Sequence, residues 1–298
     1  MNTTTASYNN APLATMLRQV LGLFKLRIGV VIAFTAVAGL AVSPGPALPA
    51  WKIAVLYLAV LVSSASAGAF NQYVESDLDA RMKRTRKRAF VTGALPRTRA
   101  WLWLILALVA GAVAAAWWAL NPWAALYTFL GAFFYAVVYT VWLKRRTWLN
   151  IVIGGLAGSF AVLAGAAAVD PAIGAVPLML ALVLFLWTPP HFWSLAIAYR
   201  KDYEAARVPM LPVVVGDRRG AQAILLHTLL LVAAALAPAF LGLGRIYLAG
   251  ALVGGAWFLA TSWQLVRNPG PKTAMSNFHA SLGQLSLLLV AAILDATL

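Results

Sequence analysis

Three oxygen-bearing side chains spaced four residues apart mark the stretch of this sequence most able to do chemistry. They are Asn71, Glu75 and Asp79, and they follow about twenty almost uncharged residues. On a helix, this spacing predicts that all three share one face, with about 5–6 Å between neighbouring Cβ atoms. Two carboxylates that close repel each other, so we expect a positive partner. Hard oxygen donors of this kind favour a divalent cation shared with a phosphate.

A basic run, Arg81–Arg88, follows directly and holds six basic residues in eight positions. Such a run is typical of a cytoplasmic loop beside a membrane span and needs no further function. The same interpretation is favoured for the three adjacent cations Lys144–Arg146, although they are also able to clamp phosphate oxygens. The acidic face differs, because the chain has only eight acidic residues and three of them fall in the stretch from Glu75 to Asp79. We therefore predict a function for that face.

A second candidate site lies near the end of an apolar stretch, in the run Thr188–Trp193. Its two prolines remove hydrogen bonds from the helix ladder, which is tolerated in a membrane where neighbours or water satisfy the backbone. His191 is predicted to lie about two turns inside the cytoplasmic edge, roughly 10 Å deep. An ionisable residue at that depth is a candidate functional group. The alternative is a neutral histidine bonded to a carbonyl that the prolines freed. His227 and His279 are predicted to be structural.

Helices that cross a membrane must position these groups. The chain has 298 residues, of which 62% are hydrophobic and only 10% charged, as is typical of a polytopic membrane protein. The absence of cysteine excludes disulfides, zinc–thiolate sites and cysteine nucleophiles. We predict an all-α fold with nine transmembrane helices around a central cavity that opens to the cytoplasmic face. A cytoplasmic segment, residues 1–25, precedes a single domain, residues 26–298. The predicted spans are Leu26–Val42, Trp51–Phe70, Trp101–Leu120, Trp123–Leu143, Trp148–Val169, Ala172–Ala198, Ala221–Leu241, Ile246–Val266 and Phe278–Leu294.

The basic residues predict the orientation of these spans. Counted loop by loop, 21 of the 23 Lys and Arg residues fall on one side of the membrane. Because positive charge marks cytoplasmic loops, the N-terminus is predicted inside and the C-terminus outside. This distribution also explains the net charge of +15 without a nucleic-acid partner. Six of the eight acidic residues lie on the same side, in the loops after the second and sixth spans: Glu75, Asp77, Asp79, Asp202, Glu204 and Asp217.

Two motifs together resemble a known family. The first combines the Asn71, Glu75 and Asp79 spacing with Met82-x-Arg84-Thr85, and the second joins the run 188–193 to Asp202-Tyr203 and to the run 209–212. They resemble the UbiA superfamily of intramembrane prenyltransferases, and within it the branch that uses heme as acceptor. There are departures. Glu75 stands where many members have aspartate. Other branches carry a second Asp-x-x-x-Asp. Here the residue four positions after Asp202 is Ala206, and the absence of that second aspartate argues against a hydroxybenzoate acceptor.

The resemblance implies farnesyl diphosphate and heme b as substrates and Mg²⁺ as cofactor. It also implies a bacterial inner membrane location and a terminal oxidase or heme A synthase as partner. The implied metal ligands are Asn71, Glu75, Asp79 and Asp202, with Lys144 and Tyr139 as further catalytic residues. The implied diphosphate-binding residues are Lys25, Arg27, Arg84, Arg88, Arg145 and Lys201. The implied contacts to heme are His191, Trp193 and Tyr203.

Two other functions remain open at this point. The first is a UbiA-type prenyltransferase with a quinone-precursor or chlorin acceptor, against which the run 188–193 and the missing second aspartate pair argue. The second is a membrane carrier of heme or of an anionic lipid. A carrier would be expected to show internal repeats and polar groups near the bilayer midplane. The charge here gathers instead at one face, as a catalytic chamber opening at that surface requires.

Overall fold

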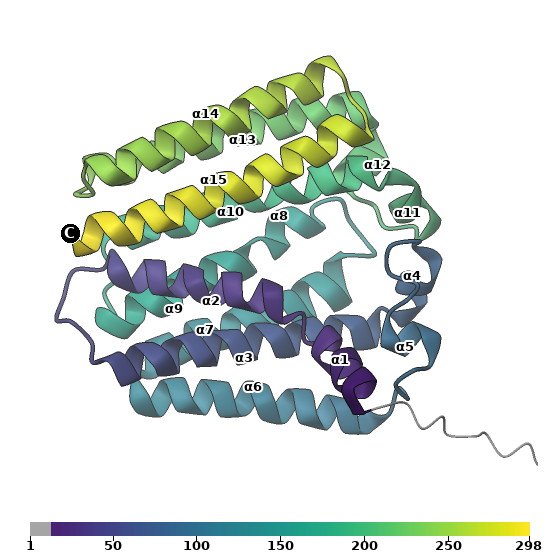
Figure 1. Ribbon diagram of the computed structural model, residues 1–298, viewed down its shortest axis with the longest axis horizontal. Helices are drawn as coiled ribbons and strands as arrows, with labels where there is room; N and C mark the ends of the chain where they lie inside the picture. The colour runs from purple at the N-terminus through teal and green to yellow at the C-terminus, as the bar shows by residue number, and fades with distance from the viewer. Residues whose placement is uncertain (1–12) are drawn as a thin grey trace, which may run out of the picture.

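The computed structural model describes residues 13–298, in which every regular element is a helix, and this confirms the all-α prediction (Figure 1). Residues 1–12 of the predicted cytoplasmic segment 1–25 lie outside the described residues. The helices of the first half are α1 (Leu13–Leu23), α2 (Leu26–Ala41), α3 (Ala50–Val74), α4 (Ser76–Arg81), α5 (Ala89–Thr92), α6 (Arg99–Ala119), α7 (Pro122–Phe133) and η1 (Phe134–Leu143). Those of the second half are α8 (Asn150–Gly154), α9 (Leu156–Val169), α10 (Ala175–Ala198), α11 (Arg200–Ala205), α12 (Leu211–Val215), α13 (Asp217–Phe240), α14 (Arg245–Arg267) and α15 (Pro271–Thr297).

The described residues hold eight helices long and apolar enough to cross a membrane, and a bent pair, α1 with α2, provides a ninth. The two helices of this pair meet at 46°, where Lys25 adopts a left-handed backbone conformation with φ 47°. The chain end at α15 lies opposite the face that carries α1, α4, α5, α11 and α12 (Figure 1). The molecule is therefore a multi-pass membrane protein whose described ends lie on opposite faces.

Two predicted spans prove to be interrupted. The predicted span 123–143 is an α-helix that becomes the π-helix η1 at Phe134, and π-helical turns occur frequently at functional sites. The predicted span 148–169 is split at Gly155 into α8 and α9. A Cβ atom on Gly154 would meet the Tyr139 ring at 2.9 Å, and one on Gly155 would meet Thr188 at 3.0 Å. These glycines thus let α8 approach both η1 and α10.

The double proline, in contrast, leaves α10 helical from Ala175 to Ala198. The two prolines remove amide donors from the helix ladder, but nearby hydroxyls contribute bonds of their own to carbonyls of the same helix. Ser194 Oγ donates to the Pro190 carbonyl at 2.6 Å, and Thr188 Oγ1 donates to the Leu184 carbonyl at 2.9 Å. His191 therefore lies on an uninterrupted part of α10.

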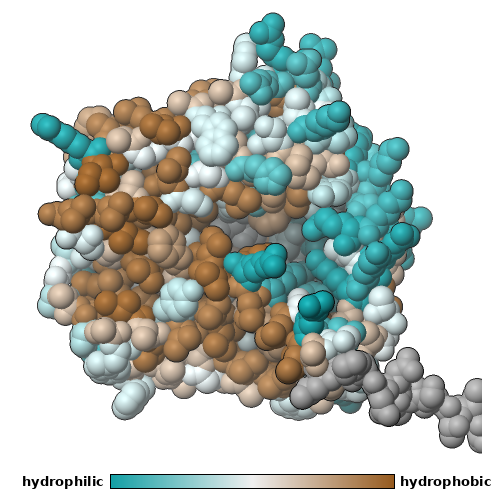
Figure 2. Space-filling view, in the orientation of Figure 1, coloured by the Kyte–Doolittle hydropathy of each residue, from teal (hydrophilic) through white to brown (hydrophobic). Residues whose placement is uncertain are grey.

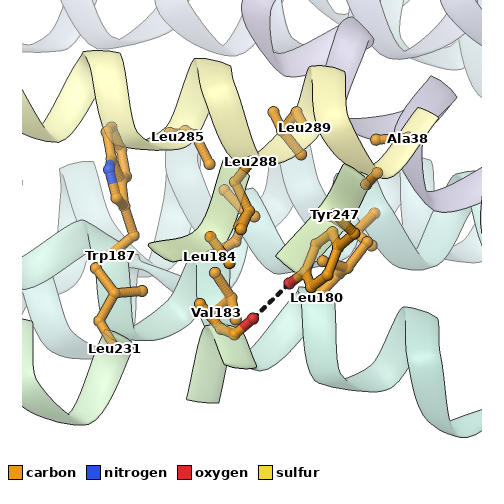
Figure 3. Close-up of a cluster of buried hydrophobic side chains, with 14 of the residues drawn as sticks. Ala38, Leu180, Val183, Leu184, Trp187, Leu231, Tyr247, Leu285, Leu288 and Leu289 are labelled. Atoms are coloured by element: carbon orange, nitrogen blue, oxygen red, sulfur yellow. Dashed lines mark hydrogen bonds between the residues drawn. The ribbon is translucent and has the colours of Figure 1, made fainter. Parts of the chain in front are cut away.

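A buried apolar cluster joins α10, α13, α14 and α15 and also includes Ala38 of α2 and Val162 of α9 (Figure 3). Trp187, Leu231 and Leu288 are among its members, and the Tyr247 hydroxyl closes it by donating to the Ala235 carbonyl at 2.7 Å. Large apolar side chains such as Trp118 and Phe240 are exposed instead, as expected of a surface that faces lipid. These contacts pack the long helices of the second half, α10, α13, α14 and α15, against one another.

Helices α2 and α9 pack in near backbone contact through two glycines. A Cβ atom added to Gly39 would lie 2.2 Å from the Val162 carbonyl oxygen, and one added to Gly165 would lie 1.8 Å from that of Ala36. Small residues allow this close approach between membrane helices. We expect Gly165→Ala to lower the free energy of unfolding by about 3 kcal/mol, the upper end of the usual cost of overpacking.

Thermal unfolding in detergent micelles measures this loss. The matched control is Gly158→Ala on the same helix, because a Cβ atom there would lie 4.0 Å from its nearest neighbour, in ordinary contact. Equal unfolding temperatures for the two variants would contradict the packing argument.

Candidate functional site

The predicted acidic face lies where α3 passes into α4. The helix is interrupted for one residue at Glu75, but the amide of Glu75 still bonds to the Asn71 carbonyl at 3.0 Å. The amide of Asp79 bonds to the Glu75 carbonyl at 2.8 Å, so the four-residue spacing is kept across the break. All three side chains are buried, with 1–4% of their surface exposed. Two carboxylates and a carboxamide therefore share one buried polar region.

A cation contacts each of these three side chains. Lys25 Nζ donates to Asn71 Oδ1 at 2.9 Å, and Lys144 Nζ donates to Glu75 Oε2. Arg88 Nη1 lies 2.8 and 2.7 Å from the two carboxylate oxygens of Asp79. The positive partners that the spacing demanded are thus present in the protein itself, and they balance charges that would be costly to bury alone.

Helix η1 orients the carboxamide and supplies an aromatic wall. Asn71 Nδ2 donates to Thr140 Oγ1 at 3.1 Å, so its oxygen is turned toward Lys25. Tyr135 and Tyr139 stack with their rings 5.7 Å apart. The Lys25 ammonium lies 6.0 Å from the first ring, and the Lys144 ammonium lies 5.5 Å from the second. Both amines are therefore held between acidic or amide oxygens and aromatic faces.

The loops after the second and sixth spans meet. The backbone amide of Arg84 donates to Asp202 Oδ2 at 3.1 Å, and the Arg84 guanidinium lies 5.4 Å from the Tyr199 ring. Leu78 and Tyr203, from the two loops, belong to one buried cluster. Figure 1 shows α4 beside α11 at the same face, and Figure 2 shows the surface hollowed where hydrophilic and hydrophobic residues meet.

His191 lies in an aromatic sandwich on α10. Its ring stacks on Trp187 at 4.1 Å and on Phe278 of α15 at 4.4 Å, and Phe192 lies edge-on at 5.0 Å. The Nδ1 atom is 2.7 Å from Ser281 Oγ. The side chain is 6% exposed. The stacked rings thus fix the plane of the imidazole, and the contacts at its edge restrict its rotation within that plane.

A family model described as the UbiA prenyltransferase family matches residues 32–288. This chain belongs to the UbiA prenyltransferase family. Protoheme IX farnesyltransferase 2 of Paramagnetospirillum magneticum is 55% identical to it over 95% of this chain and 98% of the relative. The protoheme IX farnesyltransferase of Alkalilimnicola ehrlichii is 42% identical over 94% of this chain and 93% of the relative.

Solved structures of UbiA proteins share the fold. A digeranylgeranylglyceryl phosphate synthase matches with a TM-score of 0.77 and 17% identity, over 95% of this chain and 99% of that one. A UbiA homolog from Archaeoglobus fulgidus bound to DMAPP and Mg²⁺ matches with a TM-score of 0.66 and 16% identity, over 90% of this chain and 99% of that one. At these identities the likeness shows the arrangement of helices alone.

The predicted diphosphate-binding residues of this UbiA family member fall into two groups. Lys25 and Arg88 contact the acidic face directly, and Arg84 donates its backbone amide to Asp202. Arg145 is exposed and pairs with Asp77. Arg27 and Lys201 are also exposed, and neither forms an ion pair within residues 13–298.

The three residues predicted to contact heme do not share one position. His191 lies in the sandwich described above, whereas Trp193 is 1% exposed and its ring lies edge-on to His227 at 5.0 Å. Tyr203 is buried in the same cluster as Trp193. Two residues along a helix are turned to different faces, which is why His191 and Trp193 have different neighbours.

Four residues in contact with the candidate site were absent from the sequence-based prediction: Tyr135, Thr140, Phe278 and Ser281. Tyr135 precedes Tyr139 by four residues, so helical periodicity held a signal for the tyrosine pair. Ser281 gave none, because it reaches His191 from a helix 90 residues further along the chain.

The chemistry of the acidic face suits a hard divalent cation. Within residues 13–298 no three His, Cys, Asp or Glu side chains lie close enough to hold a metal ion by themselves. The candidate set, however, includes the Asn71 carboxamide, and Glu75 Oε1 is buried without a hydrogen-bond partner among the described residues. Carboxylate and carboxamide oxygens are the ligands that such ions take. The donor set therefore fits, with one oxygen that the protein leaves unsatisfied.

The exposed pair Asp77–Arg145 offers a pH-dependent contrast to the buried acids. The hydrogen bond from Arg145 holds the pKa of the Asp77 carboxyl below its usual range. A lowered pKa contributes stability at neutral pH that is lost as pH falls through the folded-state pKa. Because the Asp77 side chain is 49% exposed, we expect Asp77→Asn to destabilise by no more than about 1 kcal/mol at pH 7. Unfolding temperatures of the variant and the original protein should converge toward acidic pH, and a constant difference would refute the assignment.

Proposed function

We propose that this chain transfers the farnesyl group of farnesyl diphosphate to a vinyl group of heme b, with addition of water, to give heme O and diphosphate. One observation carries the proposal: the buried carboxylates of Asp79 and Asp202, from the loops after the second and sixth spans, are each held by a basic residue of the run 81–88. The names of the relatives support the choice of substrates.

Four oxygen-bearing residues are proposed to hold Mg²⁺: Asn71, Glu75, Asp79 and Asp202. When bound, the ion would act as a Lewis acid and template for the diphosphate oxygens. Glu75 Oε1 is the oxygen already free to bind it. Asp202 is 8% exposed and is held by the Arg84 amide, so the later loop presents its carboxylate from a fixed backbone.

The cations around the acidic face are proposed to bind the leaving diphosphate. Lys25, Arg88 and Lys144 contact acidic or amide oxygens in this structure, and all three donors are able to bond phosphate oxygens instead. As the C–O bond of farnesyl diphosphate breaks, negative charge grows on the leaving group. Donors held in place before the reaction stabilise that charge without reorganising, which is usually the largest catalytic contribution.

The stacked tyrosines are proposed to protect the allylic cation. Aromatic faces attract positive charge through their quadrupole, and Tyr135 and Tyr139 line the wall beside the acidic face. A vinyl carbon of heme b then bonds to the farnesyl carbon. Water adds to the porphyrin-side carbon that has become electron-deficient and loses a proton, so that atoms and charge balance.

The cellular placement is part of the proposal. The protein would lie in a bacterial inner membrane with its N-terminus in the cytoplasm, as the basic loops indicate. Heme O would then pass to a terminal oxidase or to a heme A synthase. A reporter enzyme that works only outside the cytoplasm should be active when it is fused after Leu298. Activity of a reporter that works only inside the cytoplasm, fused at the same position, would reverse the proposed orientation.

Mass spectrometry of heme tests the reaction. Purified protein in detergent is incubated with heme b, farnesyl diphosphate and Mg²⁺, and the extracted heme should gain the mass of a farnesyl group plus a hydroxyl group. A parallel incubation replaces heme b with hydroxybenzoate. Prenylated hydroxybenzoate without heme O would overturn the proposal in favour of the quinone-precursor acceptor, and omission of Mg²⁺ should stop product formation.

A further inference from the structure

Ser281 of α15 contacts His191, and the hydrogen bonds of its hydroxyl bear on which ring nitrogen carries the proton. Its Oγ donates to the Phe278 carbonyl at 2.7 Å and lies 2.7 Å from His191 Nδ1. A serine hydroxyl has one proton to donate and two lone pairs. With that proton donated to the carbonyl, Oγ offers the imidazole only a lone pair. In this arrangement Nδ1 carries the proton and Nε2 is the unprotonated nitrogen.

The surroundings of the ring leave Nε2 as its one available group. Trp187 and Phe278 cover the two faces, Phe192 stands against an edge, and Ser281 occupies Nδ1. Nε2 makes no hydrogen bond to any residue from 13 to 298, and it is not among the fully buried unpartnered atoms of that range. Part of the small exposed surface of the residue is therefore at this nitrogen.

Ser281 is itself held firmly. It is fully buried, and its backbone carbonyl accepts a hydrogen bond from Trp187 Nε1 at 2.8 Å. Trp187 thus both covers a face of the imidazole and ties α10 to the residue that orients it. Contacts between α10 and α15 therefore hold the plane and the rotation of the ring.

We propose that Ser281 is a positioning residue that holds His191 as the Nδ1–H tautomer, so that Nε2 is presented as an axial ligand to the iron of the heme acceptor. Neutral imidazole is a common ligand for heme iron, and a hydrogen bond at the other nitrogen sets its tautomer. Such supporting partners orient the ligand and raise its basicity. The ligand half of the inference rests on the proposed function, whereas the tautomer half does not.

The tautomer is measured directly in protein without heme. The chain has only three histidines, so ¹⁵N-histidine labelling gives three ring systems, and His227→Gln and His279→Gln assign the other two. Long-range ¹⁵N–¹H correlation spectra distinguish the two tautomers. We expect Nδ1–H at His191 in the original protein and in Ser281→Thr, and a shift toward Nε2–H in Ser281→Ala. An Nε2–H ring in the original protein would overturn the inference without reliance on any variant.

Heme titration tests the ligand. We expect a histidine-ligated absorbance spectrum that His191→Ala abolishes, and roughly tenfold weaker heme binding in Ser281→Ala, within the usual cost of losing a supporting partner. Ser281→Thr keeps a hydroxyl at this position and should bind heme as tightly as the original protein. The matched control is Ser286→Ala, an exposed serine on the same helix. Equal affinities for the two alanine variants would overturn the inference. Intact heme ligation without heme O formation would instead refute the proposed reaction, so the two failures are distinguishable.

Discussion

Asp79→Asn is expected to lower the rate of farnesyl transfer roughly 100- to 1,000-fold, the usual effect of removing one preorganised charge-stabilising group. The carboxylate is 4% exposed and contacts Arg88 through both oxygens. Asparagine keeps the shape and one acceptor oxygen, so Arg88 keeps a hydrogen bond and the fold is expected to survive. The charge that a divalent cation requires is lost. Heme O formation at saturating Mg²⁺, followed by mass spectrometry, measures the effect.

The matched control lies two residues earlier. Asp77 is on the same short helix α4 but is half-exposed and pairs with Arg145 at the surface. Asp77→Asn should therefore turn over at nearly the original rate. If both variants kept full activity, the proposed metal site would be wrong. If both lost it, a general effect on α4 would replace the specific role assigned to Asp79.

Lys144→Met is expected to lower the free energy of unfolding by about 3–5 kcal/mol, because it leaves the Glu75 carboxylate buried without its cation. Glu75 is 1% exposed, and Lys144 is its ion-pair partner. Denaturant unfolding in detergent measures the loss. Lys201→Met is the matched control, since that lysine is exposed, and it should stay within about 0.5 kcal/mol of the original protein.

The double variant Glu75→Gln, Lys144→Met separates stability from catalysis. Replacing both members of a buried ion pair by neutral groups of similar shape is often close to neutral, so most of the lost stability should return. Farnesyl transfer should not return, because the proposed ligand and the proposed diphosphate donor are both gone. A double variant that is stable and fully active would show that this pair serves the fold alone.

Hydrophobic runs and charge counts were sufficient to predict the class of fold. A span of about twenty apolar residues has few alternatives in a bilayer, because every backbone group must be satisfied within the helix. The interruptions at Phe134 and Gly155 were missed for a local reason. The spans were predicted from the length and composition of apolar runs, and neither changes where a turn takes an extra residue or where a glycine lets a neighbouring side chain approach.

The acidic face was predictable because its members lie within nine residues of one another. On a helix, residues spaced four apart lie on the same face. The identity of their partners was not. Lys25 and Lys144 stand 46 and 69 residues from the groups they contact, and either was equally consistent with a simple topology signal. Burial decides the matter, since a buried carboxylate must find a cation whereas an exposed one need not.

The histidine site shows the same division. The run 188–193 marked His191 as unusual, but its plane, its tautomer and its free nitrogen depend on Phe278 and Ser281 of a distant helix. Trp193, two residues away, faces His227 instead. Residue types and local spacing thus identified which groups have chemistry to offer. Only the packing of helices remote in sequence determined which of them meet, because those contacts arise from burial across the bundle and leave no periodic trace.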